Sequence, residues 1–454
     1  MFRGKLKAFQ GNLLQDLITP GRLGGTLHKK EIRMKLNSMR SRAGTVLTAL
    51  VLANGIARAD VILDWNAIMV STVATQQPFA QARFAAIMHL AVFEAVNAIT
   101  GDYKAYRVTN TAPSDASPEA AAIAAAYTVL KNYFPGNAAS LDAARVSSLA
   151  VIADGPAKTS GITSGERAAA AVIAMRESDG SAPPAFYLPG LPNPGEWQPT
   201  PSCTSAGGNF LQWRNVKTFG IRSADQFRLD APPALKSARY ARDYNEVRMV
   251  GGINSAFRSQ DRSDVARFYA NVSPTAVWNL VARQLSISEG KSLSENARAF
   301  ALLNIAISDG AVATFDTKYT YNFWRPETAI RSGDLEGNRT TDPDPAFAPF
   351  ISTPCFPGYP SAHGTLSNAA REVLERLYGG RRHSILVSNP AVPGIALKYS
   401  KLKEITEDIS DARVYGGIHF RFDQDAGADL GRLVGEYVYK YNLGPAHGCT
   451  CGQD

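Results

Sequence analysis

The stretch Cys355–His363 reads CFPGYPSAH, and it stands just before a helical pattern over residues 365–378 that ends at Gly379. Ser361 and His363 therefore lie at the amino-terminal edge of a predicted helix. Backbone N–H groups at such an edge have no partner within the helix, and the helix dipole favours an anion there. Ser361 alone could be a simple helix cap, and His363 either packs in the core or faces something bound at the helix end.

A second stretch, residues 318–326, reads KYTYNFWRP and places Lys318 seven residues before Arg325. On a helix, positions seven apart lie on one side, about two turns from each other. Two cations on one face repel each other unless an anion lies between them or acidic groups pair with them. The pattern predicts either an anion site or an exposed basic pair beside buried aromatic residues.

A third stretch, residues 413–423, reads RVYGGIHFRFD. If it is helical, His419 and Asp423 stand one turn apart on the same face. A carboxylate behind an imidazole fixes its tautomer and raises its basicity. The two adjacent glycines allow a sharp turn or a close approach of the backbone to a ligand. The alternative is a local contact between Asp423 and His419 on a surface helix.

The rest of the chain shows helical periodicity almost throughout, and we expect an all-α fold of two packed helical bundles. Seven prolines between Pro183 and Pro201 exclude a continuous helix or a central strand there. We therefore expect an N-terminal bundle over 60–182, a Pro/Gly-rich excursion or linker over 183–240, and a C-terminal bundle over 241–454. Helices are predicted over 78–98, 118–134, 138–152, 164–178 and from Ser292 through at least residue 315, the last opened by a capping box with Glu295.

The N-terminal region explains most of the net charge of +8. Residues 1–59 hold 11 of the 48 Lys and Arg residues but 2 of the 40 Asp and Glu residues, so the remainder is close to neutral. That balance predicts no nucleic-acid-binding surface.

Residues 34–59 have the pattern of a secretory signal. A basic stretch over 34–42 is followed by an apolar stretch over 43–57 and a small-x-small cleavage site before Asp60. Residues 1–33 would then be an extension. A membrane anchor is the alternative, although about 15 apolar residues is short for a span. We expect an exported protein, periplasmic or secreted, with no integral membrane segment after cleavage.

The four cysteines, Cys203, Cys355, Cys449 and Cys451, do not make a disulfide scaffold in a chain of this length. Export would permit one or two disulfides, and the pairing stays open. The tail pair Cys449 and Cys451 predicts a local disulfide more strongly than a metal clip.

The three motifs in this order resemble the signature shared by the vanadium-dependent haloperoxidases, the type-2 phosphatidic-acid phosphatases and the class A acid phosphatases. The resemblance covers residues 290–445 most clearly and implies an almost wholly helical fold, with two four-helix bundles in the haloperoxidases. By this resemblance an oxyanion, vanadate or phosphate, would be bound by Lys318, Arg325, Arg413, the hydroxyl of Ser361 and the backbone N–H of Ala362.

The resemblance also implies a role for each remaining site residue. His419 would be the vanadium ligand, or the phosphorylated nucleophile in a phosphatase, and Asp423 would orient it. His363 would be the general acid–base, and Phe356 would line the pocket near the halide. Ala362 stands where the family usually has glycine, which places a methyl group beside the oxyanion. Ala412 replaces a common serine before Arg413.

The implied activity is that of a vanadate-dependent haloperoxidase, in which hydrogen peroxide oxidises a halide to a hypohalous species that halogenates an organic acceptor. Lys318 would polarise the bound peroxide. An exported acid phosphatase acting on phosphomonoesters without vanadate is the first alternative. A non-catalytic vanadate- or phosphate-binding protein is the second. The chain length favours the haloperoxidase, and the His419–Asp423 pair favours catalysis over simple binding.

Overall fold

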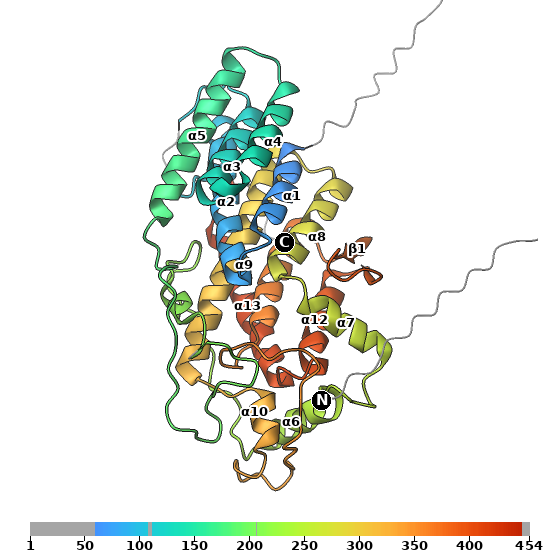
Figure 1. Cartoon of the computed structure of the whole chain (residues 1–454). Helices are drawn as coiled ribbons and strands as arrows, with labels where there is room; N and C mark the ends of the chain where they lie inside the picture. Colours follow the sequence, from blue (N-terminus) through green and yellow to red (C-terminus); the bar gives the residue numbers. More distant parts are fainter. Residues whose placement is uncertain (1–59, 108–110, 206, 447–454) are drawn as a thin grey trace, which may run out of the picture. The chain divides into compact units, whose positions relative to one another are not determined.

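The computed structural model describes residues 60–107, 111–205 and 207–446, and these residues are mostly helical (Figure 1). A single antiparallel pair of short strands within this part places Ile385 opposite Tyr399. The elements are α1 (Val61–Val73), α2 (Pro78–Thr100), α3 (Pro118–Tyr133), α4 (Ala138–Ala150), α5 (Pro156–Arg176), α6 (Ala238–Val250), α7 (Gln260–Ala270), α8 (Pro274–Glu289), α9 (Leu293–Tyr321), α10 (Pro326–Arg331), α11 (Ala362–Tyr378), β1 (Ile385–Ser388), β2 (Ala396–Tyr399), α12 (Leu402–Tyr415) and α13 (Arg421–Tyr441).

The helices begin where the sequence places capping residues. Ser117 accepts a hydrogen bond from the N–H of Ala120 at the start of α3, and Pro118 fills the first helical position. At the start of α9, Ser292 and Glu295 form the predicted reciprocal capping box. The helices predicted over 78–98, 118–134, 138–152, 164–178 and 365–378 are confirmed.

Helix α9 is the central element of the core. Its side chains from Asn296 to Tyr319 are buried apart from Arg298, and it packs against α2, α11 and α13. By length and composition alone, α2 and α9 could each cross a membrane. However, 83% and 100% of their apolar windows are buried inside the protein. Their hydrophobicity is therefore accounted for by the core.

Helices α11 and α13 lie against each other at backbone distance, which sets the geometry of the site. A Cβ atom at Gly431 would lie 2.3 Å from the carbonyl oxygen of Thr365, and one at Gly427 would lie 2.7 Å from that of Ser361. Only glycine permits this approach. The N–H of Ser361 also donates to the carbonyl of Asp423 at 2.8 Å, so the starts of the two helices are joined.

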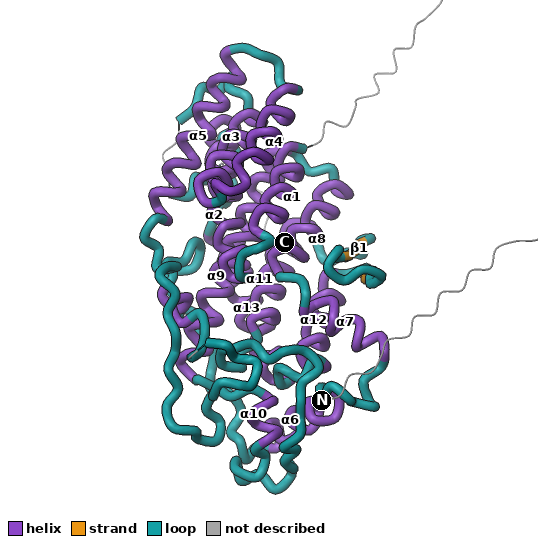
Figure 2. The backbone as a smooth tube through the Cα atoms, in the orientation of Figure 1, coloured by secondary structure: helices purple, strands orange, loops and turns teal. Residues whose placement is uncertain are grey.

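The Pro-rich excursion is confirmed as non-helical. Figure 2 shows the segment between α5 and α6 almost entirely as loop, interrupted by a short 3₁₀ turn at Leu211–Asn215. A disulfide joins Cys203 in this segment to Cys355, the first residue of the CFPGYPSAH stretch that leads into α11. The excursion is thereby fastened beside the site. Cys449 and Cys451 lie outside the described residues.

The described residues all belong to one compact unit, which spans 57–454. The domain boundaries at 182 and 240 stay a prediction. The signal sequence expected over 34–59 lies outside the described residues, and so does the extension before it.

Candidate active site

Lys318 and Arg325 do not lie on one helix, so the expectation of a shared helical face is wrong. Lys318 is in the last turn of α9, which ends at Tyr321, and Asn322 turns the chain with a φ of 47°. Arg325 has extended backbone angles at the start of α10. The reason is Pro326, because the residue before a proline is pushed out of the helical region.

The side chains of Lys318 and Arg325 nevertheless both donate hydrogen bonds to the loop before α11. The Nζ of Lys318 donates to the carbonyls of Pro357 and Gly358, at 2.7 and 2.8 Å. The guanidinium of Arg325 donates to the carbonyls of Phe356 and Ile418, at 2.8 and 3.0 Å. Each side chain is fully buried. The turn at Asn322 therefore brings the side chains of Lys318 and Arg325 to the same loop, whereas a continuous helix would have held them two turns apart.

Residues 361–363 form the start of α11, as the sequence predicts. Ser361 is the cap residue, and its hydroxyl oxygen accepts from the N–H of Gly364 at 3.2 Å. The hydroxyl proton remains available as a donor. Ala362 is the first helical residue, so its N–H has no partner within the helix. Both the capping role and the donor role suit Ser361.

Arg413 reaches the same place from the last turn of α12. Its side chain is buried, and Nη1 donates to the carbonyl of Tyr269 at 3.2 Å. Its Nε is buried without a partner among the described residues. Arg413 thus supplies a third cation from a helix distant in sequence from α9.

His419 and Asp423 are in contact, but not as residues of one helix. His419 stands in the turn before α13, and Asp423 lies in the first turn of that helix. Nδ1 of His419 lies 2.8 Å from Oδ2 of Asp423, and the N–H of Phe420 donates to the same oxygen at 3.1 Å. The predicted spacing was right and the predicted conformation was wrong, because Gly417 has a φ of 80° and interrupts the helix.

The partners of His419 determine its tautomer. Nε2 lies 2.9 Å from Nη1 of Arg325, which can only donate. Nε2 is therefore the acceptor nitrogen, and Nδ1 carries the proton that Asp423 accepts. The lone pair of Nε2 accepts from Arg325 in this structure, and it can act as a ligand or a nucleophile when a bound oxyanion accepts that N–H instead.

Burial and mutual repulsion make the protonated forms of His419, Lys318 and Arg325 less stable, which lowers their pKa values. Burial, with further repulsion from Arg325 and Lys318, lowers the pKa of His419 well below its ordinary value. Burial also lowers the pKa of Lys318 well below its ordinary value, and that of Arg325 to about 9. Burial raises the pKa of Asp423 against the opposing effect of these cations. An anion among these cations would relieve their repulsion.

His363 is a second neutral base at the edge of this cluster. Burial and then the charge of Arg413 lower the pKa of His363 well below its ordinary value. A hydrogen bond to the backbone of Val272 acts in the opposite direction. Since that carbonyl takes the ring N–H, the other ring nitrogen is free to accept a proton.

The residues present fit an oxyanion such as vanadate or phosphate. Nη2 of Arg325 and Nε of Arg413 are buried donors without a partner among the described residues. Leaving such groups unpaired is costly, so an anion that accepts from both would stabilise the site. We call these two groups, the Ser361 hydroxyl, the Ala362 N–H and the acceptor nitrogen of His419 the cradle.

A cavity of about 410 Å³ opens onto this cradle, and its lining includes Ala362, His363, Arg413 and His419. Phe356 lines it too, with its ring centroid 5.3 Å from Nζ of Lys318 and 4.9 Å from Cζ of Arg325. Of the predicted site residues, those that line the cavity are Phe356, Ala362, His363, Arg413 and His419, whereas Lys318, Arg325, Ser361 and Asp423 are not among its lining residues. The apolar walls of the cavity include Phe79, Phe210, Ile351 and Leu366, and they could not be predicted because nothing in the local sequence pattern distinguishes these residues from core residues.

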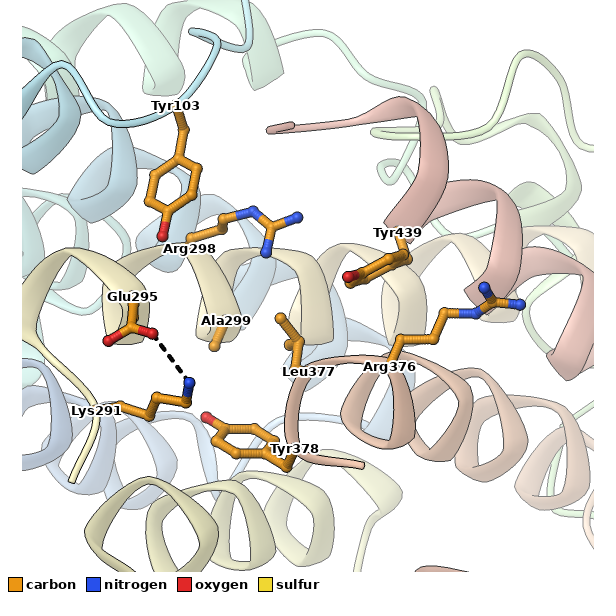
Figure 3. A pocket seen from close by; sticks show the side chains of 9 residues that line it. All are labelled: Tyr103, Lys291, Glu295, Arg298, Ala299, Arg376, Leu377, Tyr378 and Tyr439. Carbon is orange, nitrogen blue, oxygen red and sulfur yellow. Dashed lines mark hydrogen bonds and ion pairs between the residues drawn. The ribbon is translucent and has the colours of Figure 1, made fainter. Parts of the chain in front are cut away.

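A second cavity, of about 140 Å³, lies among α9, α11 and α13 (Figure 3). Lys291 pairs with Glu295 at 2.9 Å, and Arg298 donates from Nε to the carbonyl of Leu443. Arg376, which points outward in the view, pairs with Glu372 at 2.7 Å. The charged side chains that line this cavity thus have partners in the protein, unlike Nη2 of Arg325 and Nε of Arg413 in the cradle.

Comparison with known proteins agrees with this geometry. Residues 298–447 match the family model described as the VCPO second helical-bundle domain. The vanadium chloroperoxidase of Curvularia inaequalis is 23% identical over 285 residues, which cover 48% of this chain and 46% of that enzyme. The chain thus spans about half the length of this curated relative.

Two solved structures share the fold over most of the chain. A bacterial vanadium-dependent iodoperoxidase aligns with a TM-score of 0.72 and 23% identity, covering 86% of this chain and 97% of that one. A holo-type bacterial vanadium-dependent chloroperoxidase aligns with a TM-score of 0.65 and 18% identity, covering 82% and 93%. The segment from α9 to α13 thus resembles the second helical bundle of the vanadium chloroperoxidases, and most of the chain shares the fold of the two bacterial enzymes.

Proposed function

We propose that the protein is a vanadate-dependent haloperoxidase that uses hydrogen peroxide to oxidise a halide, and that the resulting hypohalous species halogenates an organic acceptor. The observation that carries the proposal is the cradle, which combines buried, unpaired donors of Arg325 and Arg413 with the unprotonated Nε2 of His419. The names of the structural relatives support the same activity.

The residues have distinct roles in this proposal. Lys318, Arg325 and Arg413 would hold the vanadate oxygens, and the Ser361 hydroxyl and Ala362 N–H would add neutral donors. His419 would be the vanadium ligand. Bound vanadate would act as a Lewis acid that activates peroxide towards the halide.

His363 and Asp423 would handle protons and orientation. His363 is neutral near neutral pH, because burial and Arg413 lower its pKa, so it can take a proton from hydrogen peroxide. Asp423 keeps the proton of His419 on Nδ1 and leaves Nε2 for the ligand bond. Phe356 packs against Lys318 and Arg325 and would shield that side of the oxyanion.

An acid phosphatase is the alternative that the same residues could support. His419 would then attack phosphorus with Nε2, and His363 would protonate the leaving group. The large apolar cavity beside His363 favours the haloperoxidase, since it provides room for an organic acceptor separate from the oxyanion. A protein that only binds the anion would not need the His419–Asp423 contact.

Parallel assays of the purified protein test the proposal. One arm supplies vanadate, hydrogen peroxide and iodide, bromide or chloride, and the other supplies a phosphomonoester without vanadate. We expect vanadate-dependent halide oxidation that His419→Ala abolishes and that His383→Ala, outside the cavity lining, leaves intact. Phosphomonoester turnover inhibited by vanadate, without halide oxidation, would contradict the proposal and support the phosphatase.

We also propose that the protein is exported. The proposal rests on the signal pattern over 34–59, and the Cys203–Cys355 disulfide is consistent with an oxidising compartment. Amino-terminal sequencing of the protein recovered from culture medium and periplasm tests this. A mature chain that begins near Asp60 is expected, and an intact amino terminus in the cytoplasm would refute export.

A further inference from the structure

The cavity above the cradle is larger than halide and peroxide require. It measures about 410 Å³, whereas one water molecule takes about 30 Å³ in the liquid. Its walls are mainly apolar and include Phe79, Phe210, Phe356 and Leu366. Cavities of this size and lining usually hold small organic ligands. The proposed reaction gives a role to the polar residues His363, Arg413 and His419, which form the floor of this cavity, but it gives none to the apolar walls.

One wall comes from the excursion, through Phe210. This residue has a φ of 67°, a left-handed conformation that is rare for a bulky side chain. Such conformations are strained and persist only where the surroundings hold them. Here the N–H of Asn209 donates to the carbonyl of Cys355 at 2.8 Å, and the N–H of Leu211 donates to that of Ala185 at 3.1 Å. The fold thus holds Phe210 in the cavity wall at a cost.

The ring of Phe210 belongs to a preformed aromatic wall. Its centroid lies 5.1 Å from that of Phe79 at an interplanar angle of 76°, and 5.9 Å from that of Phe356 at 66°. Phe79 in turn meets Phe315 edge to face at 4.6 Å. Aromatic pairs favour this arrangement, and a flat ligand ring can join it in the same way. The wall therefore suits an aromatic ligand.

The charges at the floor select against a charged ligand. Arg413 lines the cavity, and Lys318 and Arg325 lie behind Phe356, whereas no aspartate or glutamate is among the lining residues. A cationic ligand would be repelled, and an anionic one would compete for the oxyanion donors. The remaining class is a neutral ligand.

We propose that this cavity binds a small neutral aromatic acceptor and that Phe210 determines acceptor specificity; this rests on the proposed haloperoxidase function. The bound ring carbon gives an electron pair to the halogen of the hypohalous acid and forms the carbon–halogen bond. The oxygen–halogen bond breaks, the ring loses a proton, and that proton and the hydroxide leave as water. Halogenation then occurs beside His363 rather than in bulk solution.

Calorimetric titration with 2-naphthol tests the binding, with vanadate present so that the oxyanion donors are occupied and without peroxide or halide. We expect one molecule to bind per chain, and 2-naphthol-6-sulfonate, which has the same rings and an added negative charge, to bind at least tenfold more weakly. Phe210→Gly should weaken 2-naphthol binding at least tenfold while it relieves the left-handed backbone. Phe210→Leu retains an apolar side chain and should give an intermediate loss. Leu191→Ala, at an 85% exposed position of the same excursion, should bind like the wild type.

Competition between the two naphthols tests specificity in the vanadate-loaded enzyme. Free hypohalous acid gives a reference ratio of the two halogenated products. The wild type should favour the product of 2-naphthol beyond that ratio, and Phe210→Gly should return to it. Reference ratios for both proteins, or equal 2-naphthol affinity in wild type and Phe210→Gly, would overturn the proposal.

Iodide oxidation without an organic acceptor separates the two proposals. If triiodide forms but 2-naphthol does not bind, the haloperoxidase function stands and the acceptor site is refuted. If 2-naphthol binds in a Phe210-dependent way but no halide is oxidised, the binding site stands, while the haloperoxidase function and the acceptor role are refuted.

Discussion

Nδ1 of His419 lies 2.8 Å from Oδ2 of Asp423, although His419 precedes α13 and Asp423 is in its first turn. The same carboxylate oxygen accepts a hydrogen bond from the N–H of Phe420. The Asp423 carboxylate therefore joins the turn before α13 to the first turn of that helix and also holds the His419 imidazole. On the opposite side of the ring, Nε2 meets Arg325. The imidazole is thereby held at both nitrogens, with the acceptor nitrogen towards the donors of the cradle.

Asp423→Asn should weaken vanadate binding and halide oxidation by about 10- to 100-fold, the usual effect of losing a carboxylate behind a metal-bound histidine. An amide can still accept from Nδ1, but it lacks the negative charge that raises the basicity of His419. Vanadate affinity measured by calorimetry and initial rates of triiodide formation check this. Asp425→Asn, which changes a 53% exposed side chain on the same helix, is the control and should match the wild type.

The sequence allowed the helices to be predicted, but not the backbone conformation that presents the candidate site residues. Helix starts at Ser117 and Ser292 depend on local capping, which a sequence displays directly. The turn at Asn322 depends on a left-handed residue followed by Pro326, and periodicity alone does not reveal it. A seven-residue spacing was therefore compatible with both a helix and a turn.

Phe210 shows a different limit of prediction. Its place in the cavity wall results from its ring contact with Phe79 and from the hydrogen bond between the neighbouring Asn209 and Cys355, both made with residues more than 100 positions away in the chain. A phenylalanine after a Pro-rich segment carries no local sign of such a role. Long-range contacts and a strained backbone together decide its position, and a single sequence shows neither.

Arg413→Lys should weaken oxyanion binding at least tenfold while the positive charge remains. Lysine lacks the planar fork of donors, and it cannot replace both the unpaired Nε and the Nη1 bond to Tyr269. Calorimetric titration with vanadate and with phosphate measures the loss. Arg432→Lys, at an exposed pair with Glu436, is the matched control. Equal affinity in Arg413→Lys and wild type would show that charge alone holds the anion.

Vanadate should raise the unfolding temperature of the wild-type protein, because it would pair donors that are otherwise buried without partners. Binding at 100 times the dissociation constant adds about 2.7 kcal/mol to the free energy of unfolding. Thermal unfolding with and without vanadate at constant ionic strength measures this. Arg325→Met, which removes a buried cation and its donors, should abolish most of the increase. An equal increase in both proteins would place the binding elsewhere.

Loss of the Cys203–Cys355 disulfide should lower the free energy of unfolding by about 2–4 kcal/mol, because the bond closes a long loop in the unfolded chain. The double variant Cys203→Ser/Cys355→Ser should also bind 2-naphthol more weakly, since the excursion that carries Phe210 loses its covalent attachment. Urea unfolding and calorimetric titration measure the two effects. Wild type treated with reductant should reproduce both, and unchanged unfolding in the double variant would refute the stabilising role.

Glu94→Gln should change how stability depends on pH. Glu94 is 2% exposed, and burial raises its pKa to about 7, although a hydrogen bond from the N–H of Tyr106 opposes the rise. Between pH 4.5 and 7 the unfolded chain loses this proton while the folded protein keeps it. The native state then binds more protons, so the contribution of Glu94 to stability falls as pH rises through this window and is constant above it.

The measurement is the difference in the free energy of unfolding between Glu94→Gln and wild type, from urea unfolding at pH 4, 5, 6, 7 and 8. Glutamine keeps an oxygen for the Tyr106 N–H and never ionises, so other titrating groups cancel in the difference. From pH 4 to pH 8 the variant should gain on the order of 3 kcal/mol relative to the wild type. A difference that stays constant across this range would show that Glu94 ionises as easily in the folded protein as in the unfolded chain.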